Sequence, residues 1–256
     1  MADPILYELR GGAAWITLNS PENHNALSLA LCVTLDEAVA RAAAEPAARA
    51  IVLTGVGKTF CSGADLKGGG GGAARERSGG RSPFVSAMQR LWESPKPVLG
   101  RIQGNAWGGG VGLMAVCDIA VAAEGARFGF TEVRLGLIPA IISVFVLRKL
   151  GLADASRWML TGDRFGAEQA RAMNLVSQVA PEAELDAAIA ALLESLMQCG
   201  PGALGECKRL LRTVPALPLE QGLDFAEKKI GELFASDEGR EGVAAFAAKR
   251  KAAWAP

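Results

Sequence analysis

AIVLTGVGKTFCSGADL (residues 50–66) contains the pattern that decides the fold. Its first five residues are apolar or β-branched and predict a buried strand, and GVG (residues 55–57) predicts a turn directly after it. Upstream, AWITLN (residues 14–19) predicts another strand. The apolar spacing of residues 28–44 predicts a helix between the two strands, with Ser28 as its N-cap. Strand, helix and strand in this order indicate an α/β fold.

The rest of the chain divides into a continuation of this α/β core and a helical C-terminal part. Residues 83–93 have helical spacing, residues 98–103 predict a strand, and a glycine-rich turn follows at residues 104–112. From Ile141 onward the pattern is almost wholly helical. We therefore expect a core over residues 1–195 and a helical segment over 196–256. A loop with seven glycines, Lys67–Arg81, is expected at the surface, where its arginines keep it hydrated.

The composition restricts the chemistry. The 256 residues include 27 Lys and Arg, 27 Asp and Glu, and one histidine. Zero net charge argues against nucleic acid or an anionic membrane as the main partner. A single histidine cannot build a His-rich zinc site, and a Ser-His or Cys-His pair would have to use His24. General acid/base chemistry is therefore expected from carboxylates.

The cysteines and the hydropathy predict a soluble cytoplasmic protein. Five cysteines without any Cys-x-x-Cys spacing indicate reduced, mostly buried thiols. No apolar run approaches the roughly 18–20 residues of a spanning helix. The N-terminal MADPILYELRGG lacks the layout of a signal peptide.

The two glycine loops permit three interpretations. A phosphate loop ending in Gly57-Lys58-Thr59 would need glycine where Val52 stands, and residues 104–112 lack the spacing of a dinucleotide site. Alternatively, each loop follows a strand and leaves free backbone N–H groups, so that two of them could form an oxyanion hole. The glycines could also serve only close packing of helix and strand.

Several separate segments resemble the enoyl-CoA hydratase/isomerase (crotonase) superfamily, in order and over nearly the whole chain. These segments are LNSPENHNALS (18–28), LTGVGKTFCSGADL (53–66), QGNAWGGGVGLMAVCDIAVA (103–122), FGFTEVRLGLIP (128–139), LTGDRFGAEQARAMNLVSQV (160–179) and EGVAAFAAKRK (241–251). The resemblance implies an α/β core of repeated ββα units and a helical C-terminal trimerisation segment, hence a homotrimer or a dimer of trimers. It also implies an acyl-CoA thioester substrate, with coenzyme A as part of the substrate and no other cofactor or metal. By position, the oxyanion donors would be the backbone N–H groups of Ala64 and Gly109.

The same resemblance assigns Glu132 as the catalytic acid/base. Family hydratases generally use two glutamates, and the position of the other one is Gly112 here. One carboxyl group can serve hydration of a 2-enoyl-CoA, or isomerisation of a 3-enoyl-CoA to a 2-enoyl-CoA. A non-catalytic acyl-CoA-binding or RNA-binding relative is a further alternative.

The run EVRLGLIPAIIS (132–143) is similar to bacterial methylglutaconyl-CoA-type hydratases, which act on branched, carboxylated enoyl-CoAs. We expect its residues 140–142 to narrow the acyl pocket. Glu132 is expected to have a raised pKa among apolar neighbours.

The resemblance also suggests substrate contacts, several of which could equally be surface or core residues. Trp107 could wall the acyl tunnel, Asp65 and Asp118 are expected to be structural caps or pairs, and Cys61 is not expected to be a nucleophile. Phe246 and Lys249 would reach coenzyme A in a neighbouring subunit. The full set of expected substrate-binding residues is His24, Ala26, Lys58, Ser62, Asp65, Leu66, Trp107, Gly112, Pro139, Phe246 and Lys249.

Overall fold

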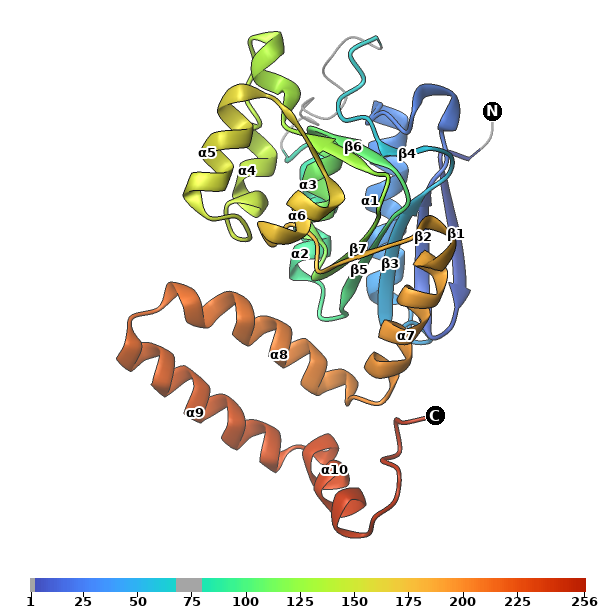
Figure 1. Ribbon diagram of the computed structural model, residues 1–256. Helices are drawn as coiled ribbons and strands as arrows, with labels where there is room; N and C mark the ends of the chain where they lie inside the picture. Colours follow the sequence, from blue (N-terminus) through green and yellow to red (C-terminus); the bar gives the residue numbers. More distant parts are fainter. Residues whose placement is uncertain (1–2, 68–79) are drawn as a thin grey trace.

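The computed structural model describes residues 3–67 and 80–256, in which helices surround two β-sheets (Figure 1). Most of the glycine-rich loop predicted at residues 67–81 lies outside the described residues. The strands are β1 (Ile5–Arg10), β2 (Ala13–Leu18), β3 (Ala50–Gly55), β4 (Thr59–Cys61), β5 (Val98–Ile102), β6 (Asn105–Trp107), β7 (Ile119–Ala123), β8 (Arg127–Gly129), β9 (Arg164–Gly166) and β10 (Gln178–Ala180).

Ten α-helices and four short 3-10 helices accompany the strands in the described residues. The α-helices are α1 (Leu29–Ala44), α2 (Pro83–Glu93), α3 (Gly109–Val116), α4 (Ala140–Val146), α5 (Leu152–Thr161), α6 (Ala167–Ala172), α7 (Leu185–Met197), α8 (Pro201–Thr213), α9 (Leu219–Ala235) and α10 (Asp237–Ala247). The 3-10 helices are η1 (Pro21–Asn23), η2 (Thr131–Leu135), η3 (Glu182–Glu184) and η4 (Val214–Ala216).

The chain crosses repeatedly from a large sheet to a small one. The large sheet has the order β1-β2-β3-β5-β7-β10, parallel except for the β1–β2 pair, and the small sheet has the order β4-β6-β8-β9, with β9 antiparallel. The units β3-β4-α2 and β5-β6-α3 each place one strand in each sheet before a helix, and β7-β8 leads through η2 to α4. This confirms the repeated ββα core.

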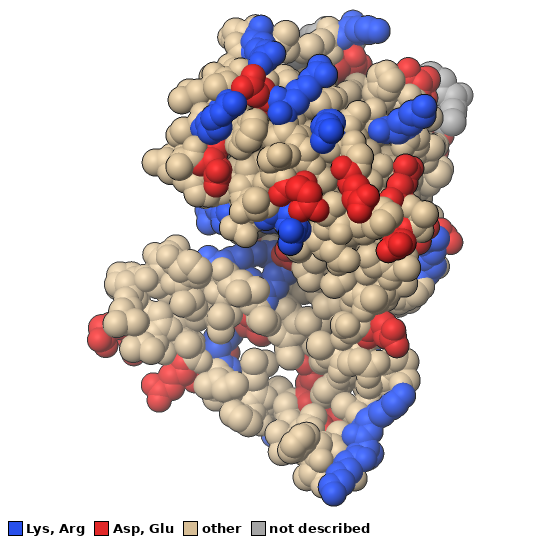
Figure 2. Space-filling view, viewed as in Figure 1, with Lys and Arg blue, Asp and Glu red and all other residues tan. Residues whose placement is uncertain are grey.

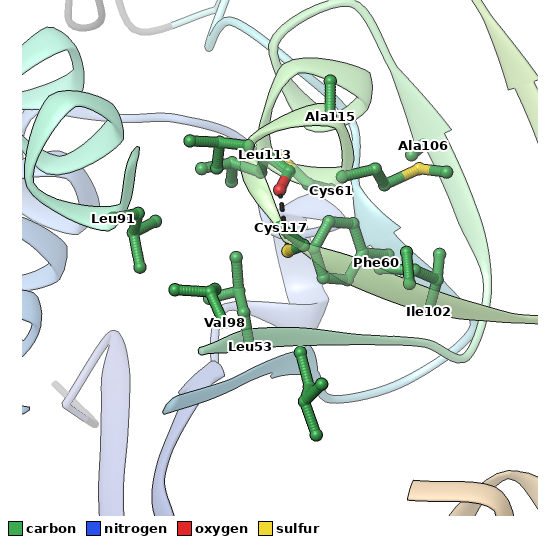
Figure 3. Packing of buried hydrophobic residues seen from close by; sticks show 14 of the residues in the cluster. Leu53, Phe60, Cys61, Leu91, Val98, Ile102, Ala106, Leu113, Ala115 and Cys117 are labelled. Atoms are coloured by element: carbon green, nitrogen blue, oxygen red, sulfur yellow. Dashed lines mark hydrogen bonds between the residues drawn. The ribbon is translucent and has the colours of Figure 1, made fainter. Parts of the chain in front are cut away.

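A dry core fixes α3 against both sheets. Leu53 and Val98 of the large sheet, Phe60 of the small sheet and Leu113 of α3 are all fully buried, and Figure 3 shows them around the same apolar cluster. Burial of such side chains contributes roughly 1.5–3 kcal/mol each. The N-terminus of α3 is therefore held in a rigid position.

Most predicted boundaries are confirmed. The Ser28 hydroxyl accepts a hydrogen bond from the backbone N–H of Leu31, as expected of an N-cap. The pattern analysis was wrong after residue 141, because β9 and β10 interrupt the helices. It also missed β1 and β4. These strands have only three to six residues and receive their pairing partners from distant parts of the chain.

The C-terminal helices extend away from the two sheets (Figure 1). α7 still packs on the core through Leu185, Ile189 and Leu193, so the boundary expected after residue 195 falls in its last turn. α8 is attached by a buried ion pair, in which Nζ of Lys208 lies 2.5 Å from Oδ2 of Asp118. The other carboxylate oxygen of Asp118, Oδ1, lies 3.6 Å from a guanidinium nitrogen of Arg212. Asp118 is thus a structural residue, as expected.

The charges are distributed without a single dominant patch on the face shown in Figure 2, where acidic and basic side chains alternate over the core. The surface over α8 and α9 is largely uncharged in the same view. Within residues 3–67 and 80–256, no single helix is long and apolar enough to cross a membrane. The segments Glu182–Met197 and Pro201–Ala216 reach that length and hydropathy only as a pair bent by 106°.

Candidate active site

The two glycine loops of the sequence meet at one place in the fold. Leu27 and Ala64 form an isolated parallel bridge, in which the backbone N–H of Leu27 donates to the carbonyl of Gly63 at 2.8 Å. Gly63 has a φ of +83°, and a Cβ built there would lie 2.7 Å from the carbonyl oxygen of Trp107 and 3.4 Å from the nitrogen of Gly109. Only glycine fits this contact, which brings the loop after β4 against the loop after β6.

Two backbone N–H groups at this junction are available to a ligand. Gly109 is the first residue of α3, and the first N–H groups of a helix have no partner within it. The N–H of Ala64 donates none of the hydrogen bonds found within the described residues. The helix N-terminus adds a partial positive charge, so the junction has the properties of an oxyanion hole.

Glu132 lies directly beside this junction. It belongs to η2, which follows β8, and a Cβ built on Gly108 would lie 2.8 Å from its Oε1. Its other oxygen, Oε2, is buried and accepts no hydrogen bond from any described residue. Burial raises the pKa of this carboxyl above its ordinary value of 4.5, and a hydrogen bond from its own backbone N–H opposes the rise in part. A raised pKa makes this carboxylate a stronger base than that of an exposed glutamate.

Ile142 fills the space beside Gly112, where the side chain of the expected second carboxylate would start. Gly112 is buried in α3, and a Cβ built on it would lie only 2.3 Å from Cγ2 of Ile142. The next neighbours are Cβ of Ile142 at 2.9 Å and Cε of Met88 at 3.3 Å. Of the isoleucines expected to narrow the acyl pocket, Ile142 packs on α3, whereas Ile141 faces a groove between α2 and α4.

The residues of the expected coenzyme A entrance lie next to the loop that follows β4. The carbonyl of His24 accepts a hydrogen bond from the backbone N–H of Ser62 at 3.0 Å, and Ala26 is buried beside Leu27. His24, Lys58 and Leu66 have exposed side chains. The structure therefore brings this part of the expected set together, while contact of these residues with coenzyme A stays a prediction.

Asn25 is a site-building residue that the pattern analysis missed. It is fully buried at a φ of 55°, and its side-chain Nδ2 donates to the carbonyls of Val56 and Thr59 at 3.0 and 2.8 Å. Its Oδ1 accepts the backbone N–H of Ser20 at 2.8 Å. Asn25 thus ties the entrance segment to the β3–β4 turn. Because asparagine tolerates positive φ, its place in HNALS could have signalled this role.

The remaining expected residues lie at different places. The Trp107 ring packs against Gly129 of β8 and beneath the guanidinium of Arg164, 5.0 Å from the ring centre. Pro139 is the N-cap of α4.

Phe246 of α10 is 87% exposed, and Lys249 follows the same helix at a φ of 53°. Figure 1 shows α10 at the opposite end of the molecule from α3. The structure does not bring these two residues to Glu132 within one chain.

Cys61 lies near the site and has the properties of an inert thiol. It is fully buried in β4, and burial raises its pKa to about 12. A thiol with such a pKa carries almost no thiolate at neutral pH, and thiolate is the reactive form. The expectation that Cys61 is not a nucleophile agrees with this environment.

Comparison with known proteins gives one consistent result. The family model described as enoyl-CoA hydratase/isomerase matches residues 8–256. A protein of Rhizobium meliloti named "Probable enoyl-CoA hydratase" is 36% identical over 98% of this chain and 97% of its own length. The (E)-benzylidenesuccinyl-CoA hydratase of Thauera aromatica is 31% identical over 98% of both chains. A solved enoyl-CoA hydratase/isomerase structure from Marinobacter aquaeolei superposes with a TM-score of 0.90 at 35% identity, over 100% of both chains.

Proposed function

Because the chain belongs to the enoyl-CoA hydratase/isomerase family, we propose that it catalyses the reversible hydration of a 2-enoyl-CoA thioester. The observation that carries the proposal is the buried carboxyl of Glu132 beside the junction of the two glycine loops. The thioester oxygen would accept hydrogen bonds from the backbone N–H groups of Ala64 and Gly109. The charge that develops on this oxygen in the enolate is stabilised there.

Glu132 then performs both proton transfers. Its carboxylate accepts a proton from water as the water oxygen bonds to C3, and the C2=C3 electron pair moves toward the thioester oxygen. The protonated carboxyl returns that proton to C2, so that one water is consumed and the carboxylate is regenerated. A raised pKa suits a group that must hold and release a proton in one cycle.

An isomerase is the second candidate, and the observation that favours it is Gly112. Without a second carboxylate in α3, Glu132 could instead remove a proton from C2 of a 3-enoyl-CoA and return it to C4. The same oxyanion hole would stabilise the enolate in this reaction. The two reactions can be distinguished by their products, because only hydration adds a water and brings solvent oxygen to C3.

We further propose a branched or carboxylated acyl group. The run EVRLGLIPAIIS (132–143) supports it by its similarity to methylglutaconyl-CoA-type hydratases. The name of the Thauera aromatica relative supports it as well, because benzylidenesuccinyl-CoA carries a free carboxylate. The proposed chemistry requires no cofactor beyond the coenzyme A of the substrate, and the cysteine pattern favours a cytoplasmic site of action.

A homotrimer, or a dimer of trimers, completes the proposal. Exposed apolar side chains on the projecting helices support assembly, since a monomer would leave them in water. They include Leu211, Leu219, Leu223, Ile230, Phe234, Val243 and Phe246. Assembly would also allow Phe246 and Lys249 to approach coenzyme A in a neighbouring subunit.

The test is a substrate panel analysed by mass spectrometry in ¹⁸O-labelled water. Crotonyl-CoA and 3-methylglutaconyl-CoA are the 2-enoyl substrates, and 3-hexenoyl-CoA tests isomerisation. We expect labelled 3-hydroxyacyl-CoA as the main product. Unlabelled 2-enoyl-CoA as the main product would favour the isomerase. Tight binding of acyl-CoA without turnover of any substrate would indicate a non-catalytic relative.

A further inference from the structure

The side chain of Ile142 and the carboxylate of Glu132 each occupy the space beside a glycine in the first part of α3 or at its N-cap. Gly108 is the N-cap of α3, and Gly112 lies within the first four residues of this helix. The space above Gly108 contains Oε1 of Glu132, and the space above Gly112 contains Cγ2 of Ile142. Ile142 therefore fills the space of a side chain at position 112, four residues after the glycine that borders the carboxylate of Glu132.

Ile142 is firmly held in this position. It is 3% exposed, and the α4 residues Phe145 and Val146 are buried next to it. A Cβ at position 112 would overlap with its Cγ2 at 2.3 Å, much closer than two carbon atoms approach without a shift of the helices. Any side chain that starts at residue 112 is thus blocked by α4, whatever its chemistry.

We infer that Ile142 is the positioning residue that restricts this site to one carboxylate. Gly112 alone does not explain the missing second acid, because a glutamate placed there would have no room. Ile142 closes the space from the α4 side and presents a methyl group where a second carboxylate or a water held by it would lie. The pair Gly112–Ile142 acts as a unit, and Glu132 is left to perform both proton transfers. This inference rests on the proposed function for its catalytic part only.

The steric part is tested by stability in a double-mutant cycle. We expect Gly112→Glu alone to lower the Tm by about 4–10 °C, through overpacking against Ile142. In the Ile142→Ala background the same substitution should lower the Tm by at most about half as much, because the methyl groups that block it are gone. Ile141→Ala is the matched control, since Ile141 faces the groove between α2 and α4 and should give no relief.

The catalytic part is tested by the pH dependence of hydration with crotonyl-CoA. In the Gly112→Glu/Ile142→Ala variant, we expect kcat/KM at least about tenfold above that of Ile142→Ala, which is a fraction of the roughly 100-fold or more that a well-placed general acid or base supplies. A second ionisation should also enter the pH profile, because two neighbouring carboxyls titrate as a coupled pair. Gly112→Glu alone should show neither change.

Different results would overturn the steric part and the catalytic part of this inference. Equal Tm losses from Gly112→Glu in all three backgrounds would overturn the inference, even in an enzyme that hydrates enoyl-CoA. The expected Tm relief with an unchanged pH profile and rate would overturn the catalytic role of Ile142. If the wild type and all variants lack turnover of any enoyl-CoA while the Tm relief is present, the proposed function fails and the packing role of Ile142 stands.

Discussion

Oε1 of Glu132 lies in the space that a side chain at Gly108 would need, since a Cβ built on Gly108 falls 2.8 Å from it. Gly108 has a φ of +47° and immediately precedes α3, whose first residue is Gly109. One glycine thus provides both the sharp turn into the helix and the room for the carboxylate. In the proposed function, this arrangement lets Glu132 and the backbone N–H groups of Ala64 and Gly109 act on one thioester.

Gly108→Ala is expected to reduce kcat by about 10–100-fold, with a smaller change in KM. The new methyl group displaces the carboxylate of Glu132, and a displacement of about 1 Å can cost 100-fold in rate. The positive φ adds a strain of roughly 1–3 kcal/mol. Steady-state kinetics with crotonyl-CoA measure the effect. Gly125→Ala is the control, because Gly125 has no atom near its Cβ position. A wild-type kcat in Gly108→Ala would contradict the assigned contact.

Lys208→Ala is expected to destabilise the fold by about 3–5 kcal/mol, measured by urea unfolding. Its Nζ lies 2.5 Å from Asp118 and also donates to the carbonyl of Lys96 at 3.0 Å, in a setting where Lys208 is 6% exposed. Removal of the cation leaves the largely buried carboxylate of Asp118, which is 25% exposed, without its main partner. Arg209→Ala is the matched control: its ion pair with Glu206, at 3.7 Å, is half exposed and contributes about 0–1 kcal/mol. An unfolding free energy of Lys208→Ala within 1 kcal/mol of the wild type would show that α8 is held by other contacts.

Glu132→Gln is expected to stabilise the protein at pH 8 more than at pH 5. Burial raises the pKa of Glu132 in the folded state above 4.5, so ionisation destabilises the fold. This cost is absent below the pKa of the unfolded chain and grows as the pH rises through the folded pKa. Glutamine does not ionise, so the substitution removes this cost. A stabilising substitution of this kind typically raises the free energy of unfolding by about 0.5–2 kcal/mol. Urea unfolding at the two pH values measures the difference. The exposed Glu194→Gln is the control, and a Glu132→Gln gain that is equal at both pH values would argue against a buried, titrating carboxyl.

The pattern analysis could predict the parts of the site that depend on neighbouring residues in the sequence. The strand at residues 50–54 and the glycine turns are local features of this kind, whereas Glu132 is assigned only through the resemblance of its segment to the family. The filled position at Gly112 could not be predicted, because it depends on how closely α4 approaches α3. The anchoring of Asp118 by Lys208 joins residues 90 positions apart, for which the sequence has no periodic signal. The short strands β9 and β10 likewise depend on partners supplied by the fold.

The central claim is that Glu132 alone moves the protons, and the most direct measurement is the hydration rate of crotonyl-CoA by Glu132→Gln. We predict that kcat falls by about 100- to 10,000-fold, the usual contribution of a general acid/base. The Kd for butyryl-CoA should stay within about threefold, because the backbone N–H groups of Ala64 and Gly109 are untouched. Wild-type-like hydration by Glu132→Gln would contradict the account.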